Sequence, residues 1–598
     1  MDRTAWIVVI LCVIGLVAWQ IYVAKQMPPR PVPINVVSGQ ASPTATPRVF
    51  EPSPPPGVPE ATPKSTGPVP SFAEKIETLR NSDVELRLTN RGGGIKEAVL
   101  VRQIAEKGQR VVLNSAQSAP IGAIIEEPSA PTLPEFTAST ESNSVVQFER
   151  TTDEQVVVRK KFSFEKSSEN KDNYVIDMDV DLENRGTGPY RKPDYFVALG
   201  SAVPIHVKDY PYYTKLFWYI PGKGLSGKDV SWFAASGGFL GLGQRAARSS
   251  YQESIRDVEW VGVSNQFFVT LIAPLSATLA GKTIDSWKAN GVWGRSFDVQ
   301  RTPDQKLAGI EGALQVPGFQ LQPGETFSAH FEIYAGPKLY HRLAQLSHNE
   351  AEVMDFSSFT MLKVISQFLL NFLNFLHSWL GNYGLAILAL TTVIKLTLWP
   401  IQNRANRSMR QMAALSPKMQ ELRDKYKDDP TRMNQELMKL YKQYGINPVG
   451  GCLPMMIQIP IFFGLFTMLG RAVELRNATF LWVRDLSQPD TLFVIPGMGW
   501  IPFFGIPAVG LPINILPILM GATNAWLVHM TPKSGDPTQR RMMLFMPIIF
   551  LLFCYNFAAA LALYYTAQNL FSILQFYQNK RQPMPTLEKV APPGKQKR

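Results

Sequence analysis

Lys395 is the residue of this sequence whose chemistry most needs an explanation. It lies in the apolar run LAILALTTVIKLTLWP, five residues before Pro400. An ammonium group inside a hydrophobic span costs about 2.5–3.5 kcal/mol on insertion scales, so it either faces a hydrated cavity or extends along its alkyl chain to the headgroups. Thr391 lies four residues earlier on the same helical face and continues one polar stripe. The stripe favours a hydrated cavity, and the headgroup alternative stays open.

Polar side chains in other apolar segments could line the same cavity. Gln458 lies in one of these segments, and Tyr565, Gln568 and Asn569 lie in another. Together they could form a hydrophilic pocket in the inner leaflet that offers hydrogen bonds to a polar guest. The alternative is structural, since small polar residues often join neighbouring helices.

The remaining reactive residue types form no recognisable site. The three cysteines (Cys12, Cys452 and Cys554) each lie within or beside an apolar stretch, and the six histidines are scattered singly. No CxxC or Cys/His spacing suggests a metal site. The sequence also shows no nucleophile–base pair and no Gly-rich phosphate loop. We therefore expect no metal, no cofactor and no enzymatic activity.

Charge and hydropathy divide the chain into two kinds of region. It has 598 residues and a formal net charge of +12. Residues 72–345 have the composition of a soluble domain, whereas residues 359–577 contain long apolar stretches. Much of the basic excess flanks those stretches, which indicates membrane orientation rather than nucleic-acid binding. We expect no partner with a specific nucleic-acid sequence.

The N-terminal region begins with an apolar segment at 6–23, close to the length needed to cross a bilayer. A cleaved signal peptide is the alternative. It is weakened because the start has only Arg3, offset by Asp2, and because no A-x-A-like site follows. An uncleaved anchor is therefore favoured. Residues 28–71 are dense in proline, which predicts an extended, semi-rigid linker.

Residues 72–345 predict a large β-sandwich. The clearest strand is 174–183, where apolar and acidic residues alternate in the sequence YVIDMDVDLE, as is typical of a half-buried antiparallel strand. The run NRGGGI at 90–95 predicts a turn, because glycine adopts positive φ. A passive or partner-docking role is favoured over a glycan-binding or enzymatic one. Further strands are expected at 84–89, 155–164, 266–273 and 329–335.

Six membrane spans are expected. The segment 350–375 has apolar residues at helical spacing with polar interruptions, which predicts an amphipathic helix at the membrane interface. The stretch 492–509 is apolar but broken by prolines and glycines, so we interpret it as a loop at the outer interface. Besides the anchor at 6–23, the spans are 376–400, 452–470, 511–530, 542–557 and 558–577, and the segments outside them are 1–5, 401–451, 471–510, 531–541 and the basic tail 578–598.

Basic residues predict the orientation of these spans. Residues 401–451 contain ten lysines and arginines against five acidic residues, whereas the loop 471–510 has only three basic residues. The loop 531–541 and the tail are also basic. By the positive-inside rule these three segments and both termini are cytoplasmic, and the β-domain lies on the opposite side of the membrane.

The segment 401–451 predicts a helical hairpin. Two stripes of methionine, leucine and tyrosine at three-four spacing are separated by Asp428, Asp429 and Pro430. Asp429 can cap the second helix, and Pro430 can occupy its first position. Either the two stripes bury each other, or they form an apolar surface for a partner, since methionine repacks easily. Both can hold.

The sequence resembles the YidC insertase family. The run NPVGGCLPMMIQIPIF at 447–462 closely resembles the family signature N-P-x-G-G-C-x-P-x-x-x-Q-x-P-I-F. The anchor, linker and large β-domain are similar to those of the Gram-negative form. Shorter matches follow in the family's order: GNYG at 381–384, VEL at 473–475, FMP at 545–547 and LYY at 563–565.

The resemblance implies a fold, a location and a function. The fold is a polytopic α-helical membrane protein of six spans with a five-helix insertase core, plus a large periplasmic all-β supersandwich domain. The location is the cell inner membrane, with both termini cytoplasmic. The function is to insert integral membrane proteins and help them fold, alone or with the Sec translocon. The implied partners are nascent membrane proteins, the Sec translocon, the ribosome and membrane lipids.

The resemblance also implies roles for particular residues. The family's intramembrane cation is usually arginine, and Lys395 stands at its position, which keeps the charge but loses bidentate hydrogen bonding. Thr391 and Tyr565 match positions in a groove open to the cytoplasm, and Phe462 and Phe553 match an apolar slide for the substrate. A secondary transporter or channel is the alternative, but we find none of the paired broken helices in internal repeats that mark such proteins.

Overall fold

The structure is a computed structural model that describes residues 72–580, apart from 106–107, 117, 130, 143, 165–172, 208, 236–244, 303–304, 358, 447–452, 507–508 and 532–536. The predicted anchor at 6–23, the linker at 28–71 and nearly all of the tail at 578–598 lie outside the described residues. The first part of the family-like run at 447–462 does so too.

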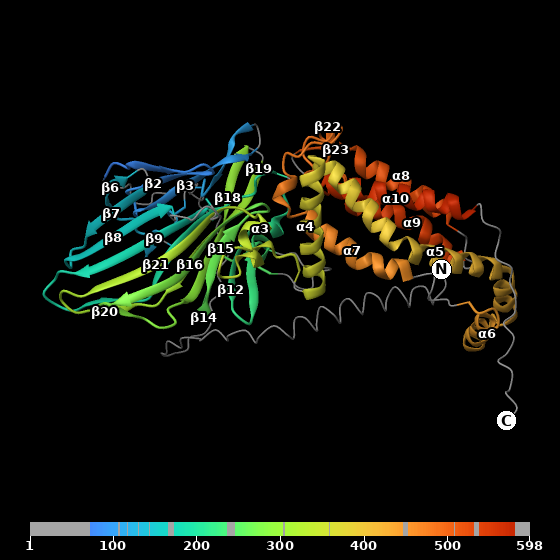
Figure 1. Ribbon diagram of the computed structural model, residues 1–598, viewed down its shortest axis with the longest axis horizontal. Helices are drawn as coiled ribbons and strands as arrows, with labels where there is room; N and C mark the ends of the chain where they lie inside the picture. The colour runs from blue at the N-terminus through green and yellow to red at the C-terminus, as the bar shows by residue number, and fades with distance from the viewer. Residues whose placement is uncertain are drawn as a thin grey trace, which may run out of the picture. The chain divides into compact units, whose positions relative to one another are not determined.

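Antiparallel sheets build the first half of the described chain (Figure 1). A four-stranded sheet has the order β1 (Ile76–Arg80), β2 (Val84–Thr89), β3 (Gly94–Ile104) and β4 (Arg110–Leu113). A five-stranded sheet has the order β14 (Tyr251–Val258), β18 (Ala289–Thr302), β19 (Gln305–Val316), β11 (Tyr195–Ala202) and β5 (Ile124–Ile125). Two short strands, β10 (Tyr190–Lys192) and β20 (Phe319–Leu321), pair separately.

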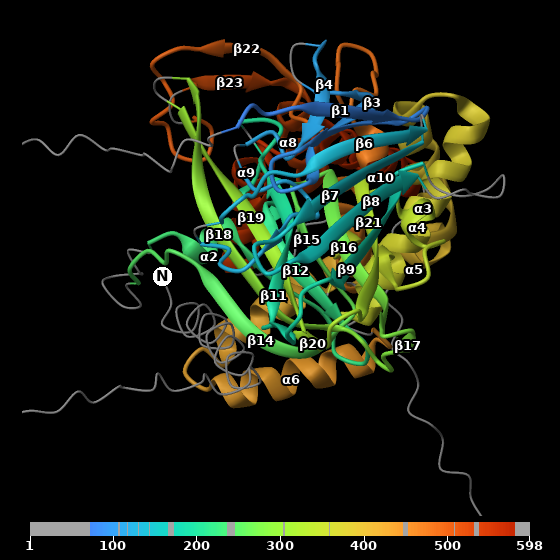
Figure 2. The same cartoon turned by 90° about the vertical axis from the view of Figure 1, so that its left-hand side faces the viewer.

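The largest sheet has ten strands, and Figure 2 shows its central strands side by side. The predicted β-rich architecture of this region is confirmed. The order is β13 (Gly224–Asp229), β12 (Lys215–Ile220), β15 (Trp260–Ser264), β16 (Phe268–Leu279), β21 (Thr326–Pro337), β9 (Val175–Asn184), β8 (Val156–Phe164), β7 (Val145–Thr151) and β6 (Thr137–Ser142), with β17 (Lys282–Thr283) paired to β16.

Strand β9 shows why the sheet has one buried face. Its apolar residues from Ile176 to Leu182 are buried, and the aspartates between them are partly exposed. The predicted alternation at 174–183 is therefore confirmed. On the buried side, Phe148 of β7 and Phe162 of β8 meet edge to face with ring centroids 6.1 Å apart, an arrangement that aromatic pairs prefer.

Lys160 lies on the buried face of β8, where the alternation would place an apolar residue. Its side chain is fully buried, and its Nζ donates to the carbonyl oxygens of Gly92 (2.8 Å), Gly93 (2.6 Å) and Gly122 (2.9 Å). Gly92 and Gly93 have φ of 76° and 54°, so the turn predicted at 90–95 is confirmed. The ammonium group ties this turn to β8.

Helices build the second half of the described chain, and α10 lies against α5, α7 and α8 (Figure 1). Two single-turn helices, α2 (Val230–Phe233) and α3 (Tyr340–Leu343), belong to the β-rich region. The longer helices are α4 (Thr360–Leu380), α5 (Tyr383–Lys425), α6 (Pro430–Gln443), α7 (Leu453–Leu469), α8 (Ile515–Met530), α9 (Pro537–Cys554) and α10 (Ala559–Lys580).

The boundary predicted between 350–375 and 376–400 is wrong. Helix α4 continues to Leu380, where Gly381 at a φ of 66° ends it and donates its N–H to the carbonyl of His377. Asn382 then starts α5, because its side chain accepts from the N–H of Leu385 at 3.1 Å. Hydropathy does not change at residue 376, so cap chemistry alone marks the true boundary.

Helix α5 also passes the predicted end of the span at 400. It runs without a break through Pro400 and Pro417 to Lys425, so the span and the first arm of the hairpin are one helix. The predicted break at 428–430 is confirmed, because α6 begins at Pro430 and the Asp429 side chain accepts from the N–H of Arg432 at 3.0 Å.

The hairpin formed by α5 and α6 has a small apolar core of its own. Leu415 and Met419 of α5 pack with Leu437 of α6 and with Tyr444. The two predicted stripes therefore bury each other at these positions. Met409 of the first stripe is partly exposed and lies outside this core.

Two further predicted spans begin elsewhere. Residues 511–514 of the span predicted at 511–530 form β23 (Leu511–Asn514), which pairs with β22 (Thr491–Ile495), and α8 starts only at Ile515. Helix α9 begins at Pro537, inside the loop predicted at 531–541. Within its described residues, the stretch 492–509 contains no helix.

Among the described residues, one helix, α5, is long and apolar enough to cross a membrane by length and composition. Three shorter apolar helices occur at Met456–Leu469, Ile515–Met530 and Leu544–Cys554. The number of six spans therefore stays a prediction.

Lys160 generates a prediction about stability and pH. Burial lowers the pKa of Lys160 from 10.5 to about 7. The unfolded chain then binds this proton more tightly than the folded chain, so the Lys160 contribution to the free energy of unfolding should rise as the pH increases from about 7 towards 10.5. Lys160→Met should abolish this rise and should lower the free energy of unfolding by about 2–4 kcal/mol, because three carbonyl oxygens lose their donor.

Thermal unfolding of the full chain in detergent, repeated across this pH range, measures both effects. Lys161→Met is the matched control, because Lys161 lies on the other face of β8 and is partly exposed. Equal shifts for the two variants would contradict the role given to Lys160.

Candidate functional site

The Lys395 side chain points from α5 towards α10. It is 4% exposed, and its Nζ donates to the hydroxyl oxygen of Ser572 at 2.7 Å. Ser572 in turn donates to the carbonyl of Gln568 at 3.0 Å, one turn earlier on α10. The Ser572 hydroxyl therefore accepts a hydrogen bond from the ammonium group and donates its own hydrogen to the Gln568 carbonyl. The positive charge of Lys395 thus has a neutral hydrogen-bond partner.

Further polar contacts join α5 and α10 on the C-terminal side of Lys395 and Ser572. Asn403 of α5 accepts from the side-chain amides of Gln575 (2.7 Å) and Asn579 (3.4 Å) on α10. Arg410 donates to the carbonyl of Asn579 at 2.8 Å. We call the contacts of Lys395, Asn403, Ser572, Gln575 and Asn579 the α5–α10 polar seam.

Gln568 brings a third helix to the seam. The Gln458 amide of α7 donates to the Gln568 side-chain oxygen at 3.0 Å. Both glutamines are partly exposed. The structure thus gathers Lys395, Gln458 and Gln568, from three different helices, around one stretch of α10.

Thr391 and Asn569 do not offer their polar groups to this site. Thr391 is fully buried, and its hydroxyl donates to the carbonyl of Ile387 on its own helix at 2.7 Å. The Asn569 amide faces α8, where it donates to the hydroxyl of Thr523 at 3.1 Å and the carbonyl of Met520 at 3.3 Å. Asn569 follows Gln568 directly, and a step of about 100° around the helix turns it to another neighbour.

The aromatic site residues lie in two separate groups. The ring of Tyr565 contacts Phe462 at 5.4 Å and Phe550 at 5.2 Å between centroids. The Tyr565 hydroxyl is buried and has no hydrogen-bond partner among the described residues. Phe553 is 64% exposed and its ring lies 6.2 Å from that of Phe503, so in this structure it belongs to another surface than Phe462.

The sequence reasoning missed Ser572, Gln575 and Asn403. Polar residues recur in α10 at positions 568, 572, 575 and 579, which is the spacing of one helical face. The same face of α5 holds Thr391, Lys395 and Asn403 at multiples of four residues. Matching these two stripes would have found the seam.

Removing the Ser572 hydroxyl tests the seam. Ser572→Ala leaves the Lys395 ammonium without its hydrogen-bond acceptor, so it should lower the free energy of unfolding by about 1–3 kcal/mol. Thr566→Ala is the control, since the Thr566 hydroxyl donates to the carbonyl of Ala562 on its own helix, α10, at 2.8 Å. Thermal unfolding in detergent compares the two, and equal losses would show that Lys395 does not depend on Ser572.

Two family models match the chain. The model described as "60Kd inner membrane protein" covers residues 375–585, and the model described as "YidC periplasmic domain" covers residues 77–371. The two matches adjoin each other and together include both the sheets and the helices described above.

Curated relatives carry the same family description. A protein of Syntrophus aciditrophicus called "Membrane protein insertase YidC" is 30% identical over 620 residues, an alignment of 97% of this chain and 100% of the relative. A protein of Syntrophobacter fumaroxidans with the same name is 39% identical over 322 residues, about half of either chain (53% of each). Among solved structures, one described as an active YidC insertase with its first transmembrane domain resolved covers 85% of this chain and 95% of its own, with 18% identity and a TM-score of 0.32.

Proposed function

Because the chain belongs to the YidC family of membrane protein insertases, we propose that the site around Lys395 receives the hydrophilic segments of proteins that enter the bilayer. The protein is an insertase of the inner membrane with a periplasmic β-rich domain and a helical core, and its substrates are nascent membrane proteins.

The buried charge of Lys395 is the observation that carries this proposal. Its ammonium group donates to the neutral hydroxyl of Ser572, and no carboxylate forms an ion pair with it among the described residues. A buried ammonium without a counter-ion is unfavourable, and it keeps its attraction for an acidic or strongly polar guest. A segment with acidic residues would satisfy it better than the serine does.

In the proposed mechanism, the space beside α5, α7 and α10 opens to the cytoplasm, admits water and stays closed to the outside. A polar segment then crosses a thinner apolar barrier, because a hydrated groove replaces part of the hydrocarbon. The hydrophobic effect next draws the apolar part of the substrate along exposed apolar side chains, of which Phe553 is one, into the lipid. Phe462 packs against Tyr565 and lines the other surface. This mechanism needs no catalytic residue, cofactor or nucleotide.

We also propose six spans with both termini in the cytoplasm and the β-rich domain outside. The ten basic residues at 401–451 support this orientation. The basic hairpin of α5 and α6 would then face the ribosome, and the β-rich domain and the core would be free to contact the Sec translocon. A transporter or channel finds no comparable support in the described contacts.

Charge reversal at Lys395 tests the electrostatic step. Lys395→Glu should slow insertion of a single-span substrate with an acidic tail by at least about tenfold, the factor that about 1.4 kcal/mol produces. Lys395→Arg is the matched control and should insert normally, since it keeps the charge. The measurement is protease protection of the tail in proteoliposomes. Unchanged insertion by Lys395→Glu would reject the attraction mechanism.

Cysteine labelling tests the orientation. In a chain whose native cysteines Cys12, Cys452 and Cys554 are replaced by serine, Trp500→Cys and Lys427→Cys introduce thiols at exposed positions on the two proposed sides. A membrane-impermeant maleimide added to intact cells should label the first variant, and it should label the second only after lysis. Labelling of Lys427→Cys in intact cells would overturn the topology.

A further inference from the structure

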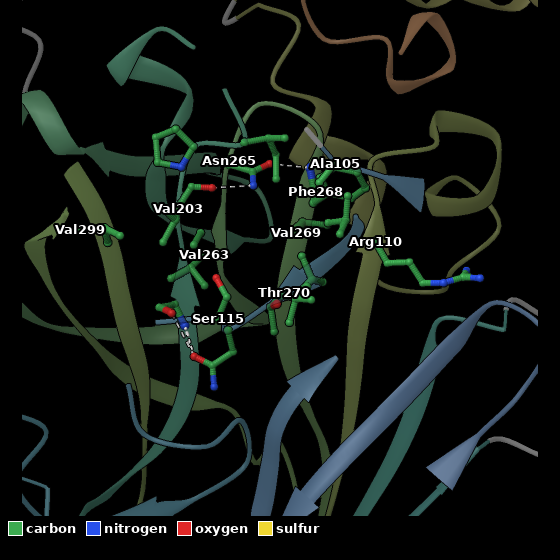
Figure 3. A pocket seen from close by; sticks show the side chains of 18 of the residues that line it. Ala105, Arg110, Ser115, Val203, Val263, Asn265, Phe268, Val269, Thr270 and Val299 are labelled. Carbon is green, nitrogen blue, oxygen red and sulfur yellow. Dashed lines mark hydrogen bonds between the residues drawn. The ribbon is translucent and has the colours of Figure 1, made fainter. Parts of the chain in front are cut away.

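A cavity of about 420 Å³ lies in the β-rich domain beside β4, β11 and β16 (Figure 3). This volume is within the range of about 300–1,000 Å³ that is typical of ligand sites. Its walls combine valines with main chain and a few polar side chains, and the insertion mechanism makes no use of it.

The wall formed by β4 presents the edge of the strand. Residues 109–115 line the cavity without a gap, and so do residues 201–205. A strand that turned one face to the cavity would contribute every second residue, since side chains alternate. An unbroken run means that the main chain itself borders the space. In the described part of the chain, β4 is the last strand of its sheet and pairs on one side with β3.

Three polar side chains in the wall, those of Asn114, Ser201 and Asn265, are already hydrogen-bonded within the domain. Asn114 accepts from the main-chain N–H (2.9 Å) and hydroxyl (3.0 Å) of Ser201 and donates to the carbonyls of Lys96 and Ala119. Asn265 donates to the carbonyl of Val203 at 2.9 Å, as Figure 3 shows. These bonds hold the cavity in shape. The main-chain edge of β4, unpaired among the described residues, remains to hydrogen-bond a guest.

The cavity adjoins the segment that follows α7. Arg476 donates to the carbonyl of Ile104 at 2.9 Å, next to the lining residue Ala105. The Arg476 guanidinium also lies 4.9 Å from the ring centre of Phe268, another lining residue. The cavity therefore lies beside the segment that leaves α7.

We propose that the cavity binds an extended polypeptide segment, which adds to the free edge of β4 as a further strand. This rests on the proposed function, because the ligands are unfolded outer-face segments of the substrates. Val112, Val203 and Val299, the lining valines that are partly exposed, receive small apolar side chains of the guest. Arg110 is exposed at the rim and, in Figure 3, reaches away from the other labelled side chains, so it selects guests with an acidic residue just outside the cavity.

Crosslinking from the strand edge tests the proposal. A photoreactive phenylalanine analogue at Val112 of β4 should crosslink a nascent single-span substrate with an unfolded acidic outer tail. The matched control is the same analogue at Thr78, an exposed position on β1, the other edge strand of this sheet. Crosslinks from Val112 and none from Thr78 support the site. Equal yields, or none from Val112 while the substrate inserts, overturn it.

Peptide binding separates this proposal from the insertase function. A fluorescein-labelled unstructured peptide of alternating valine and serine with an acidic end should bind the purified full chain in detergent. Arg110→Glu should weaken it by about tenfold, the factor of about 1.4 kcal/mol. The control Lys282→Glu, on the exposed strand β17, should not. Lack of peptide binding overturns the cavity proposal alone, whereas failure of the wild-type chain to insert any substrate refutes the proposed function.

Discussion

A buried ammonium group needs hydrogen-bond acceptors around it, and the helical core contains one, Lys395, with a single neutral acceptor among the described residues. Lys395 is almost fully buried, and its ammonium group donates to the hydroxyl of Ser572. Lys160 of the β-rich domain is buried to the same degree, but three carbonyl oxygens surround its Nζ. Lys395 therefore still attracts a polar or acidic guest, whereas the hydrogen bonds of Lys160 are made within the domain. This difference separates a residue that can act on a guest from one that holds a turn in place.

Polar contacts also decide which helices become neighbours. Lipid and apolar side chains solvate a helix about equally well, so hydrogen bonds and close packing select its partners. Ser572 and Gln575 bind α5, Gln568 binds α7 and Asn569 binds α8, all from α10. Helix α10 is thus the element on which the site is assembled. On the outer side, Asp355 pairs with Lys215 of β12 and with Arg471 after α7, which links the β-rich domain to the core.

Patterns with a regular period were predicted well from the sequence. The alternation at 174–183 predicted the strand β9, and the glycines at 90–95 predicted a turn; the structure contains both. The break before Pro430 was also found, because Asp429 and Pro430 have a local role that needs no other part of the chain. The boundary at Gly381 and the continuity of α5 through Pro400 were missed. Apolar residues lie on both sides of Gly381, so hydropathy marks no boundary there. After Pro400 the sequence becomes polar and basic, but the helix continues through the proline.

The sequence by itself determined that a cation lies in an apolar helix, that Gln568 and Asn569 interrupt another apolar segment, and that a β-rich domain precedes the helices. These properties depend on residue type and period alone. Only the tertiary structure decided that Ser572 faces Lys395, that Asn569 turns away to α8, and that the edge of β4 borders a cavity. The reason is geometric. A period identifies a face of a helix or strand, but the element that covers this face comes from a distant part of the chain.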